Sequence, residues 1–434
     1  MTKTMVRVCF AESVADIEEL LIQILLFVPT RSVIKLKCVC KQWLALISDP
    51  EFQRRHTVPN PNPKISAFFC GKIRQKVFKS ILLGSPAGNP FRAFQDSVPA
   101  GKNWRIIQSC NGLFLCNNND NNRTVYVVNP TTNQFRALSS PRVRQDVDIY
   151  GFVRYALAFD PSVSPHYKVV CVTNSVPTHF LNMEREGEQH KIDIYSSETG
   201  RWKHLNIPFF QSPSDEGMHF DVKEMAMHFD GRSSESSVFC NGAVHWIRRL
   251  PRLETSRNNY IEFQRQQNDV FHYFNLAEER LELVASPLPV PSHVKNIRCI
   301  WPTLTQRYFG ECGGHLYLIE IFDRNTQLEV LEMEREYSGW FAKYHVDLNP
   351  LMAALCPRQD WYEFVVLGLF REAKCDENEE EDSLTNLWLH MHGKVVSFDL
   401  KNTAIKKSGF FLFVGDNYCR GVNKYLYMDT LACV

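Results

Sequence analysis

Cys38 and Cys40 lie one residue apart beside Trp43, where two thiols could bind a metal or take part in redox chemistry. Structural zinc sites prefer cysteines separated by about two to four residues, together with a second ligand pair. No second pair follows at a suitable distance. If the segment is helical, the two side chains point roughly 200° apart. We therefore expect both cysteines to be buried packing residues.

Basic side chains around this pair suggest a second chemistry, contact with nucleic-acid phosphates. They form no long run and alternate with an apolar stripe, at Arg31, Lys35, Lys37 and Lys41. The whole chain of 434 residues carries a formal net charge of only +1, which argues against broad electrostatic attraction to nucleic acid. We expect no nucleic-acid partner.

The remaining metal-type and acidic residues are scattered. A polar insertion contains His219, Asp221, His228 and Asp230, which leaves a metal site there as a minor alternative. The acidic stretch 375–382 reads as a solvated loop, or as a contact for a basic partner. No nucleophile elbow, phosphate-binding loop, zinc-protease motif or dinucleotide-binding fingerprint occurs. We expect a protein that is not an enzyme, with no metal and no cofactor.

The composition is that of a globular protein, with 44% hydrophobic and 22% charged residues, and is long enough for more than one domain. No apolar run reaches the ~20 residues that span a bilayer, and the first residues lack the hydrophobic region of a secretory signal. Many of the 14 cysteines lie in apolar runs such as KVVCV, as expected for reduced thiols. These features predict a cytoplasmic and/or nuclear protein without membrane contact.

Residues 14–57 have helical periodicity. Asp16 is a candidate N-cap, and an apolar stripe follows at Ile17, Leu20, Leu21, Ile24, Leu25 and Val28. Pro29 ends this helix, a second begins near Thr30 or Ser32, and a third carries Trp43. A fourth begins at Pro50 with Asp49 as its cap. So short a group of helices buries little surface by itself. We therefore expect it to need a partner protein or docking on the rest of the chain.

Short strands and tight turns follow a proline-rich linker at 58–64. One module recurs, with strands on both sides of a tight turn, over 104–138, 155–205, 237–284, 308–333 and 387–408. Asn-Gly and Gly-Gly in these turns predict two-residue hairpins. Repeated four-stranded units favour a β-propeller, and we expect about six blades. The sixth would pair KISAFFC and KVFKSILL with the late strands GFFLFV and YLYMDTL.

Residues 14–52 resemble an F-box. The shared features are the I-L-x-x-x-P core (Ile24, Leu25, Pro29), the V-C-K-x-W segment (Val39 to Trp43) and the ending L-I-S-D-P-x-F. The phrases SCNGLFLC, VVNPTTNQF, LAFDPSVSPHYKVVCV and IYSSETGRW resemble plant F-box proteins with a kelch-like F-box-associated domain. We expect an all-α F-box domain at 10–57, a linker at 58–64, and an all-β kelch-like propeller at 65–434.

The resemblance implies an adaptor of an SCF-type (Skp1–cullin–F-box) ubiquitin ligase. The F-box would bind Skp1, and through it the cullin, while the propeller captures a protein for ubiquitination. The Skp1-binding residues that we predict are Leu20, Ile24, Leu25, Val28, Pro29, Leu36, Val39, Cys40, Trp43 and Ile47. About half of them are also expected in the core of the helical bundle, together with Cys38 and Leu44. The usual opening Leu-Pro of an F-box is absent near Ala15 and Asp16, and we expect binding to survive its loss.

Two alternatives belong to other functional classes. The propeller could bind a glycan or small ligand that modulates or specifies target capture, which would require aromatic and polar side chains converging on one face. A copper redox enzyme would need grouped Tyr, His and Cys residues, and the sequence shows no such grouping. We expect the residues that determine target specificity in the loops at 174–190, 210–235 and 250–268. The composition of these loops does not identify the target protein.

Overall fold

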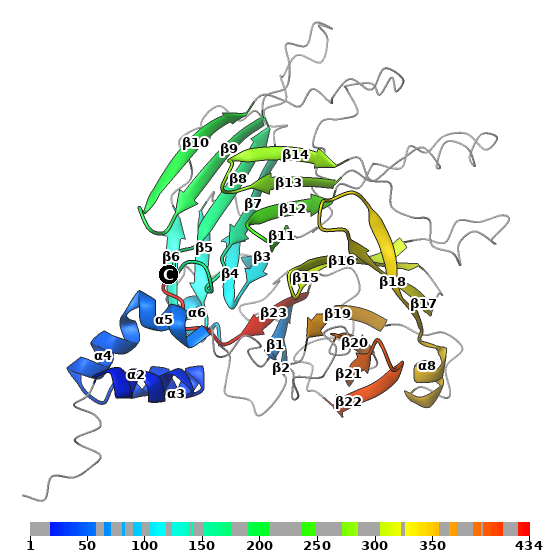
Figure 1. Cartoon of the computed structure of the whole chain (residues 1–434), viewed down its shortest axis with the longest axis horizontal. Coiled ribbons are helices and arrows are strands. Elements are labelled where there is room, and N and C mark those ends of the chain that lie inside the picture. Colours follow the sequence, from blue (N-terminus) through cyan, green and yellow to red (C-terminus); the bar gives the residue numbers. More distant parts are fainter. Residues whose placement is uncertain are drawn as a thin grey trace, which may run out of the picture.

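The computed structural model describes residues 18–57, 65–70, 80–82, 90–97, 104–118, 124–138, 141, 152–174, 190–207, 237–247, 271–284, 304–322, 326–355, 364–371, 385–391, 394–410 and 424–434. Figure 1 shows a small group of helices, drawn in dark blue, beside a larger set of β-sheets. The predicted N-cap Asp16 and the loops expected to carry specificity, apart from their ends, lie outside the described residues.

Four short helices form the first part, as predicted. They are α2 (Glu18–Leu26), α3 (Thr30–Leu36), α4 (Lys41–Ser48) and α5 (Pro50–Thr57). Pro29 separates the first two, with φ −54° and ψ 140°, values outside the helical region. Asp49 caps α5, because its Oδ1 accepts hydrogen bonds from the backbone N–H groups of Glu51 (2.9 Å) and Phe52 (3.0 Å). The predicted stop at Pro29 and the predicted cap at Asp49 are therefore confirmed.

The two closely spaced cysteines do not lie on a helix. Helix α3 is capped by Lys37, and Cys40 has extended backbone angles (φ −159°, ψ 171°) at the start of α4. Cys38 and Cys40 are both exposed free thiols. The prediction that they pack in a core was wrong, because the segment between α3 and α4 turns away from helical geometry and carries both side chains to the surface.

Within the described residues, five four-stranded antiparallel sheets follow along the chain, each with its strands in sequential order. Each contains one of the five predicted modules. The first consists of β3 (Trp104–Cys110), β4 (Leu113–Asn118), β5 (Val125–Asn129) and β6 (Gln134–Leu138); the second of β7 (Phe152–Ala158), β8 (Lys168–Asn174), β9 (His190–Ser196) and β10 (Arg201–Ile207). The third consists of β11 (Val238–Cys240), β12 (Ala243–Ile247), β13 (Phe271–Asn275) and β14 (Arg280–Val284). The fourth comprises β15 (Leu304–Cys312), β16 (His315–Phe322), β17 (Gln327–Met333) and β18 (Trp340–Asp347); the fifth β19 (Phe364–Arg371), β20 (Thr385–Met391), β21 (Lys394–Asp399) and β22 (Ala404–Phe410).

Tight turns join the first two strands in three of these sheets. Asn111-Gly112 and Asn241-Gly242 have positive φ at both residues (45° and 84°; 48° and 77°), and Gly313-Gly314 does as well (60° and 79°). Asparagine and glycine tolerate this left-handed backbone conformation. The hairpin prediction is therefore confirmed at all three turns, while Gly393 of the fifth module lies outside the described residues.

A three-stranded sheet closes the propeller by joining the two ends of the β-region. Strand β1 (Ile65–Cys70) pairs with β2 (Ser80–Leu82) on one side and with β23 (Lys424–Met428) on the other. The first strands of the five blades contact one another in sequence, and β23 contacts both β19 and β3, which completes the ring. The expected closure is confirmed for β1, β2 and β23. It was wrong for Gly409 and Phe410 of GFFLFV, which pair with β21 in the fifth blade, and the other four residues of that segment lie outside the described residues.

Side-chain amides join inner strands of neighbouring blades. Gln108 of β3 donates to the carbonyl of Leu157 (2.8 Å) and accepts from its N–H (2.7 Å). Gln306 of β15 makes the same pair of bonds to Val366, at 3.1 and 3.2 Å. Since buried polar groups are costly unless bonded, these bridges favour one alignment between adjacent blades.

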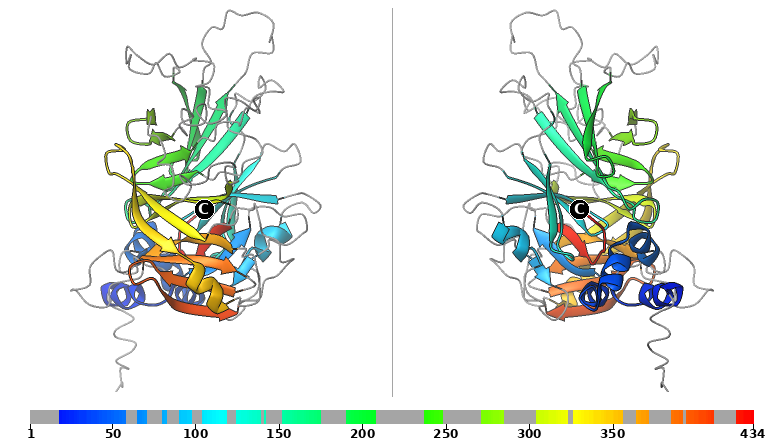
Figure 2. Two further views of the ribbon diagram at one scale, coloured as in Figure 1. Left: turned by 90° about the vertical axis from the view of Figure 1, so that its right-hand side faces the viewer. Right: turned by 90° about the vertical axis from the view of Figure 1, so that its left-hand side faces the viewer.

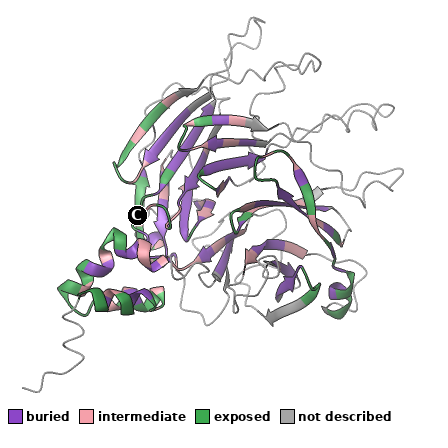
Figure 3. Cartoon of the chain, viewed as in Figure 1, coloured by how far each residue is buried: buried purple, intermediate pink, exposed green. Residues whose placement is uncertain are grey.

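Two further short helices, α6 (Arg92–Ser97) and α8 (Asn349–Leu355), lie at the edges of the β-region (Figure 2). Neither helix was predicted from the sequence. Figure 3 shows that buried residues follow the strands, whereas exposed residues cover much of α2–α4. The propeller thus has its own hydrophobic core, and the helical bundle presents the more exposed surface.

Candidate protein-binding site

The core of the helical bundle is formed by one side of each helix. Its buried residues are Leu21, Leu25, Leu26, Val33, Leu46, Ile47, Phe52 and Leu431. Two predicted Skp1-binding residues, Leu25 and Ile47, are among them and are almost fully buried. Val28, Leu36 and Trp43 are partly buried and pack against this core. These five residues therefore shape the bundle from within or at its margin.

The other five predicted residues lie on the surface. Leu20, Ile24 and Val39 are 45%, 53% and 58% exposed, and Pro29 and Cys40 are exposed as well. Leu20 and Ile24 are one helical turn apart and share a face of α2. The predicted stripe therefore divides in two, with Leu21 and Leu25 turned inward and Leu20 and Ile24 turned outward.

Two further apolar residues on this surface were missed. Phe27, 74% exposed, follows α2 in line with Leu20 and Ile24, and its i, i+3 spacing from Ile24 is a signal that could have found it. Leu44 on α4 is 47% exposed. The prediction that Leu44 and Cys38 are internal packing residues was wrong, because Leu46 and Ile47 fill the core side of α4.

Large exposed hydrophobic side chains concentrate on the helical bundle. Among the described residues, five of the seven belong to it, namely Leu20, Ile24, Phe27, Val39 and Leu44; the other two are Val163 and Phe341. Single exposed apolar residues are ordinary, whereas several in one small domain are typical of an interaction surface. We refer to these five residues as the apolar surface of the bundle.

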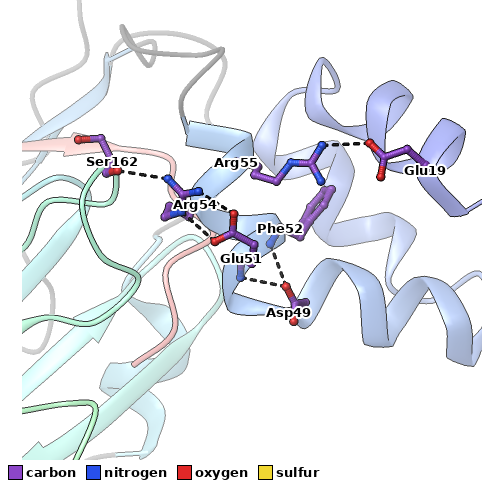
Figure 4. A network of polar contacts seen from close by, with 7 residues as sticks. All are labelled: Glu19, Asp49, Glu51, Phe52, Arg54, Arg55 and Ser162. Carbon is purple, nitrogen blue, oxygen red and sulfur yellow. Dashed lines mark hydrogen bonds and ion pairs between the residues drawn. The ribbon is translucent and has the colours of Figure 1, made fainter.

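Helix α5 makes one ion pair to α2, one within itself, and a hydrogen bond to the propeller (Figure 4). Arg55 pairs with Glu19 of α2 at 3.2 Å, and Arg54 pairs with Glu51 at 2.6 Å. Arg54 also donates to the backbone carbonyl of Ser162, which lies between β7 and β8 of the propeller, at 3.5 Å. Because these groups are largely exposed, the pairs orient the helices more than they stabilise them.

A buried histidine links α5 to the turn after α2. The ring Nε2 of His56 lies 2.8 Å from the carbonyl of Val28. Burial lowers the pKa of His56 below its usual value, because the charged ring would be removed from water. The neutral form is therefore the one that stabilises the bundle.

Polar clusters within the propeller are bonded internally. The buried carboxylate of Glu332 lies 2.9 Å from His315 Nδ1 and 2.7 Å from Lys343 Nζ, between adjacent strands of one blade. His245 Nε2 lies 2.8 Å from the hydroxyl of Tyr337, and burial lowers the pKa of His245 to about 4. The Glu332 contacts join strands within the fourth blade, whereas the His245 contact joins β12 of the third blade to the turn between β17 and β18 of the fourth.

The buried propeller cysteines have the chemistry of core residues. Burial raises the pKa of the Cys110, Cys240 and Cys312 thiols to about 12, so they stay protonated and unreactive at neutral pH. In the parts of the chain that the structure describes, no three His, Cys, Asp or Glu side chains are grouped to hold a metal. None of the described helices is long and apolar enough to cross a membrane. The insertion with His219 and the acidic stretch 375–382 lie outside the described residues.

Comparison with known proteins matches both parts of the chain. Residues 18–55 match the F-box domain family, and residues 93–301 match the F-box associated beta propeller domain family.

Several plant proteins are similar in sequence to this chain. F-box protein At5g07610 of Arabidopsis thaliana is 31% identical over 416 residues, which cover 92% of this chain and 86% of that protein. F-box only protein 8 of the same plant is 29% identical over 47% of this chain and 68% of its own length. The F-box/kelch-repeat protein At3g23880, also from Arabidopsis thaliana, is 24% identical over 52% of this chain and 57% of its own length. The chain therefore belongs to the family of F-box proteins with an F-box associated β-propeller domain.

Proposed function

We propose that this protein is the substrate-recognition adaptor of an SCF-type ubiquitin ligase. Its F-box binds a Skp1-type protein and through it the cullin, and its propeller captures the protein that is ubiquitinated. The adaptor performs no catalytic step and acts in the cytoplasm and/or nucleus. Family membership supports the adaptor role. The apolar surface of the bundle is the observation that supports the proposed Skp1-docking site.

The proposed contact residues follow from exposure. Leu20, Ile24, Phe27, Val39 and Leu44 supply the apolar area that a partner would cover, with Pro29 and Cys40 beside them. Val28, Leu36 and Trp43 contribute their exposed parts, and Leu25 and Ile47 support the surface from beneath. An amphipathic helix docked in an apolar groove is a common mode of recognition, and its energy comes from such exposed side chains.

The test is complex formation between the purified full chain and a Skp1-type protein, followed by size-exclusion chromatography and calorimetry. The double variant Ile24→Asp/Phe27→Asp should lose the complex, because two carboxylates would be buried without partners. Phe341→Asp is the matched control, since this residue on β18 is also an exposed large hydrophobic. Failure of the unmodified chain to bind, or equal binding by the folded double variant, would overturn the proposal.

The same double variant provides a route to the target. A chain with an intact propeller that no longer binds Skp1 should hold its target without promoting its degradation. Proximity labelling with this variant, compared with the unmodified chain, should enrich the target. The alternative that the propeller binds a glycan or small ligand stays a prediction, testable by screening the purified chain against glycans.

A further inference from the structure

A short segment after β23 contacts both parts of the molecule. Residues 429–434 run from the propeller closure to the helical bundle, and the end of the chain lies beside α5 (Figure 1). Alternate side chains of an extended segment point in opposite directions. Here the odd-numbered residues contact the helices and the even-numbered residues contact the first two blades. We call residues 429–434 the tail.

Hydrogen bonds between the backbone of the tail and side chains of the first blade hold the tail on the propeller. Asn129, fully buried at the end of β5, donates through Nδ2 to the carbonyls of Thr430 (3.2 Å) and Ala432 (2.7 Å). The N–H of Thr430 donates to Thr131 Oγ1 at 3.1 Å. Ala432 is buried in the hydrophobic core between the first and second blades. These contacts fix the position of the tail on the propeller.

The other side of the tail completes the helical bundle. Leu431 is 4% exposed and belongs to the same core as Leu25, Val33 and Ile47. The carboxylate of Asp429 pairs with Arg31 Nε of α3 at 2.9 Å. Gln53 of α5 donates to Cys433 Sγ at 3.3 Å. A residue far away in the sequence therefore belongs to the buried core of the bundle.

Next to the tail, the two parts of the molecule are separated by an open cleft of about 550 Å³. Its walls include Arg31 and Lys35 of α3 on one side, and Arg92 and Thr131 of the propeller region on the other. Beside this cleft, the tail bridges the two parts, together with the hydrogen bond from Arg54 of α5 to Ser162 of the propeller. The tail directly follows β23, the strand that closes the ring.

We propose that the tail is a positioning element that makes F-box and propeller one cooperative unit. Leu431 completes the F-box core only when β23 has paired with β1, so the apolar surface of the bundle is fully formed only on a closed propeller. The Skp1-facing surface and the target-binding domain are thereby held in a fixed relative orientation. The consequence for Skp1 rests on the proposed function; the structural coupling does not.

Hydrogen exchange of the full chain tests the coupling directly. Leu431→Ala should accelerate amide exchange throughout α2–α5 by about 30-fold or more, the equivalent of the ~2 kcal/mol minimum for deleting a buried leucine side chain. Leu400→Ala is the matched control, because Leu400 is equally buried but belongs to the core between the fourth and fifth blades. This control should leave exchange in α2–α5 unchanged. Equal protection of α2–α5 in the Leu431→Ala variant and the unmodified chain would overturn the proposal.

A milder perturbation is available if Leu431→Ala fails to fold. Asp429→Arg places two cations together and should accelerate exchange in the helices severalfold, whereas the swap Arg31→Asp/Asp429→Arg should restore protection. No acceleration by Asp429→Arg would contradict the coupling.

Skp1 affinity gives a second, separate readout. We expect Leu431→Ala to weaken binding and Leu400→Ala to leave it unchanged. If the unmodified chain does not bind Skp1 but Leu431→Ala still accelerates amide exchange in α2–α5, the adaptor function is refuted and the coupling is supported. If Skp1 binds and Leu431→Ala changes neither exchange nor affinity, the coupling falls and the adaptor function stands.

Discussion

Neighbouring positions on α2 allow binding and folding to be separated. Ile24 and Leu25 are adjacent in the sequence, yet Ile24 is exposed and Leu25 is buried in the bundle core. Phe27, the most exposed residue of the apolar surface, lies on the same side as Ile24. We therefore consider the double variant Ile24→Ala/Phe27→Ala against the single variant Leu25→Ala.

The exposed fractions set the expected loss of affinity. Fully burying an Ile or Phe side chain contributes about 1.5–3 kcal/mol. Scaled by the 53% and 74% of Ile24 and Phe27 that a partner could cover, the two side chains together contribute roughly 2.5 kcal/mol. That corresponds to a Kd about 70-fold higher in the double variant. Stability should change by no more than about 0.5 kcal/mol, because neither side chain belongs to the core.

Leu25→Ala should instead lower the stability of the protein and leave the Kd for Skp1 largely unchanged. Loss of a buried leucine costs about 2–5 kcal/mol of stability, while the contact surface keeps its own side chains. Calorimetric Kd values for a Skp1-type protein, measured where each variant is still folded, and thermal unfolding would provide both quantities. A double variant that is folded and binds within about threefold of the unmodified chain would refute the assignment of this surface.

Three further predictions concern stability. Asp49→Ala should lower the free energy of unfolding by about 1 kcal/mol because it removes the cap of α5. Asp49→Asn should keep most of that stability, and thermal unfolding would measure both variants. His56 is held neutral, so its contribution is complete above its unfolded pKa of about 6.5 and declines as the pH falls below that value. The protection factors of amides in α2–α5, taken relative to the intrinsic exchange rates at each pH, should therefore fall between pH 7.5 and 5.5, and a His56→Gln variant with the same pH dependence would contradict this. Gly112→Ala should be more destabilising than Gly242→Ala, since both have positive φ but only at Gly112 would the new Cβ lie 2.6 Å from Thr430 Cγ2; equal unfolding temperatures would argue against contact with the tail.

Local signals in the sequence were reliable. The break at Pro29, the cap at Asp49 and the turns at Gly112 and Gly242 depend on φ and ψ preferences of a few adjacent residues, and the structure has them where they were predicted. The repeated module also identified all five four-stranded blades, because each blade is a local meander.

Side-chain direction at the bundle was less predictable. Leu20, Leu21, Ile24 and Leu25 are all apolar, so periodicity alone does not distinguish the core side of α2 from its exposed side. Leu44 was misassigned for the same reason, and Cys38 because its segment between α3 and α4 is not helical. The positions of Leu44 and of the α2 residues depend on which side α5 and Leu431 occupy, and this is decided by packing between segments far apart in the chain.

The sequence by itself determined the family, the helical bundle, the hairpins and the repeated blades, because short-range patterns and family motifs specify each of them. Only the tertiary structure decided which apolar residues remain for a partner, and that Leu431 belongs to the bundle core. These features join residues hundreds of positions apart. Their energy comes from burial against surfaces that exist only once the ring has closed, and no local period encodes such a contact.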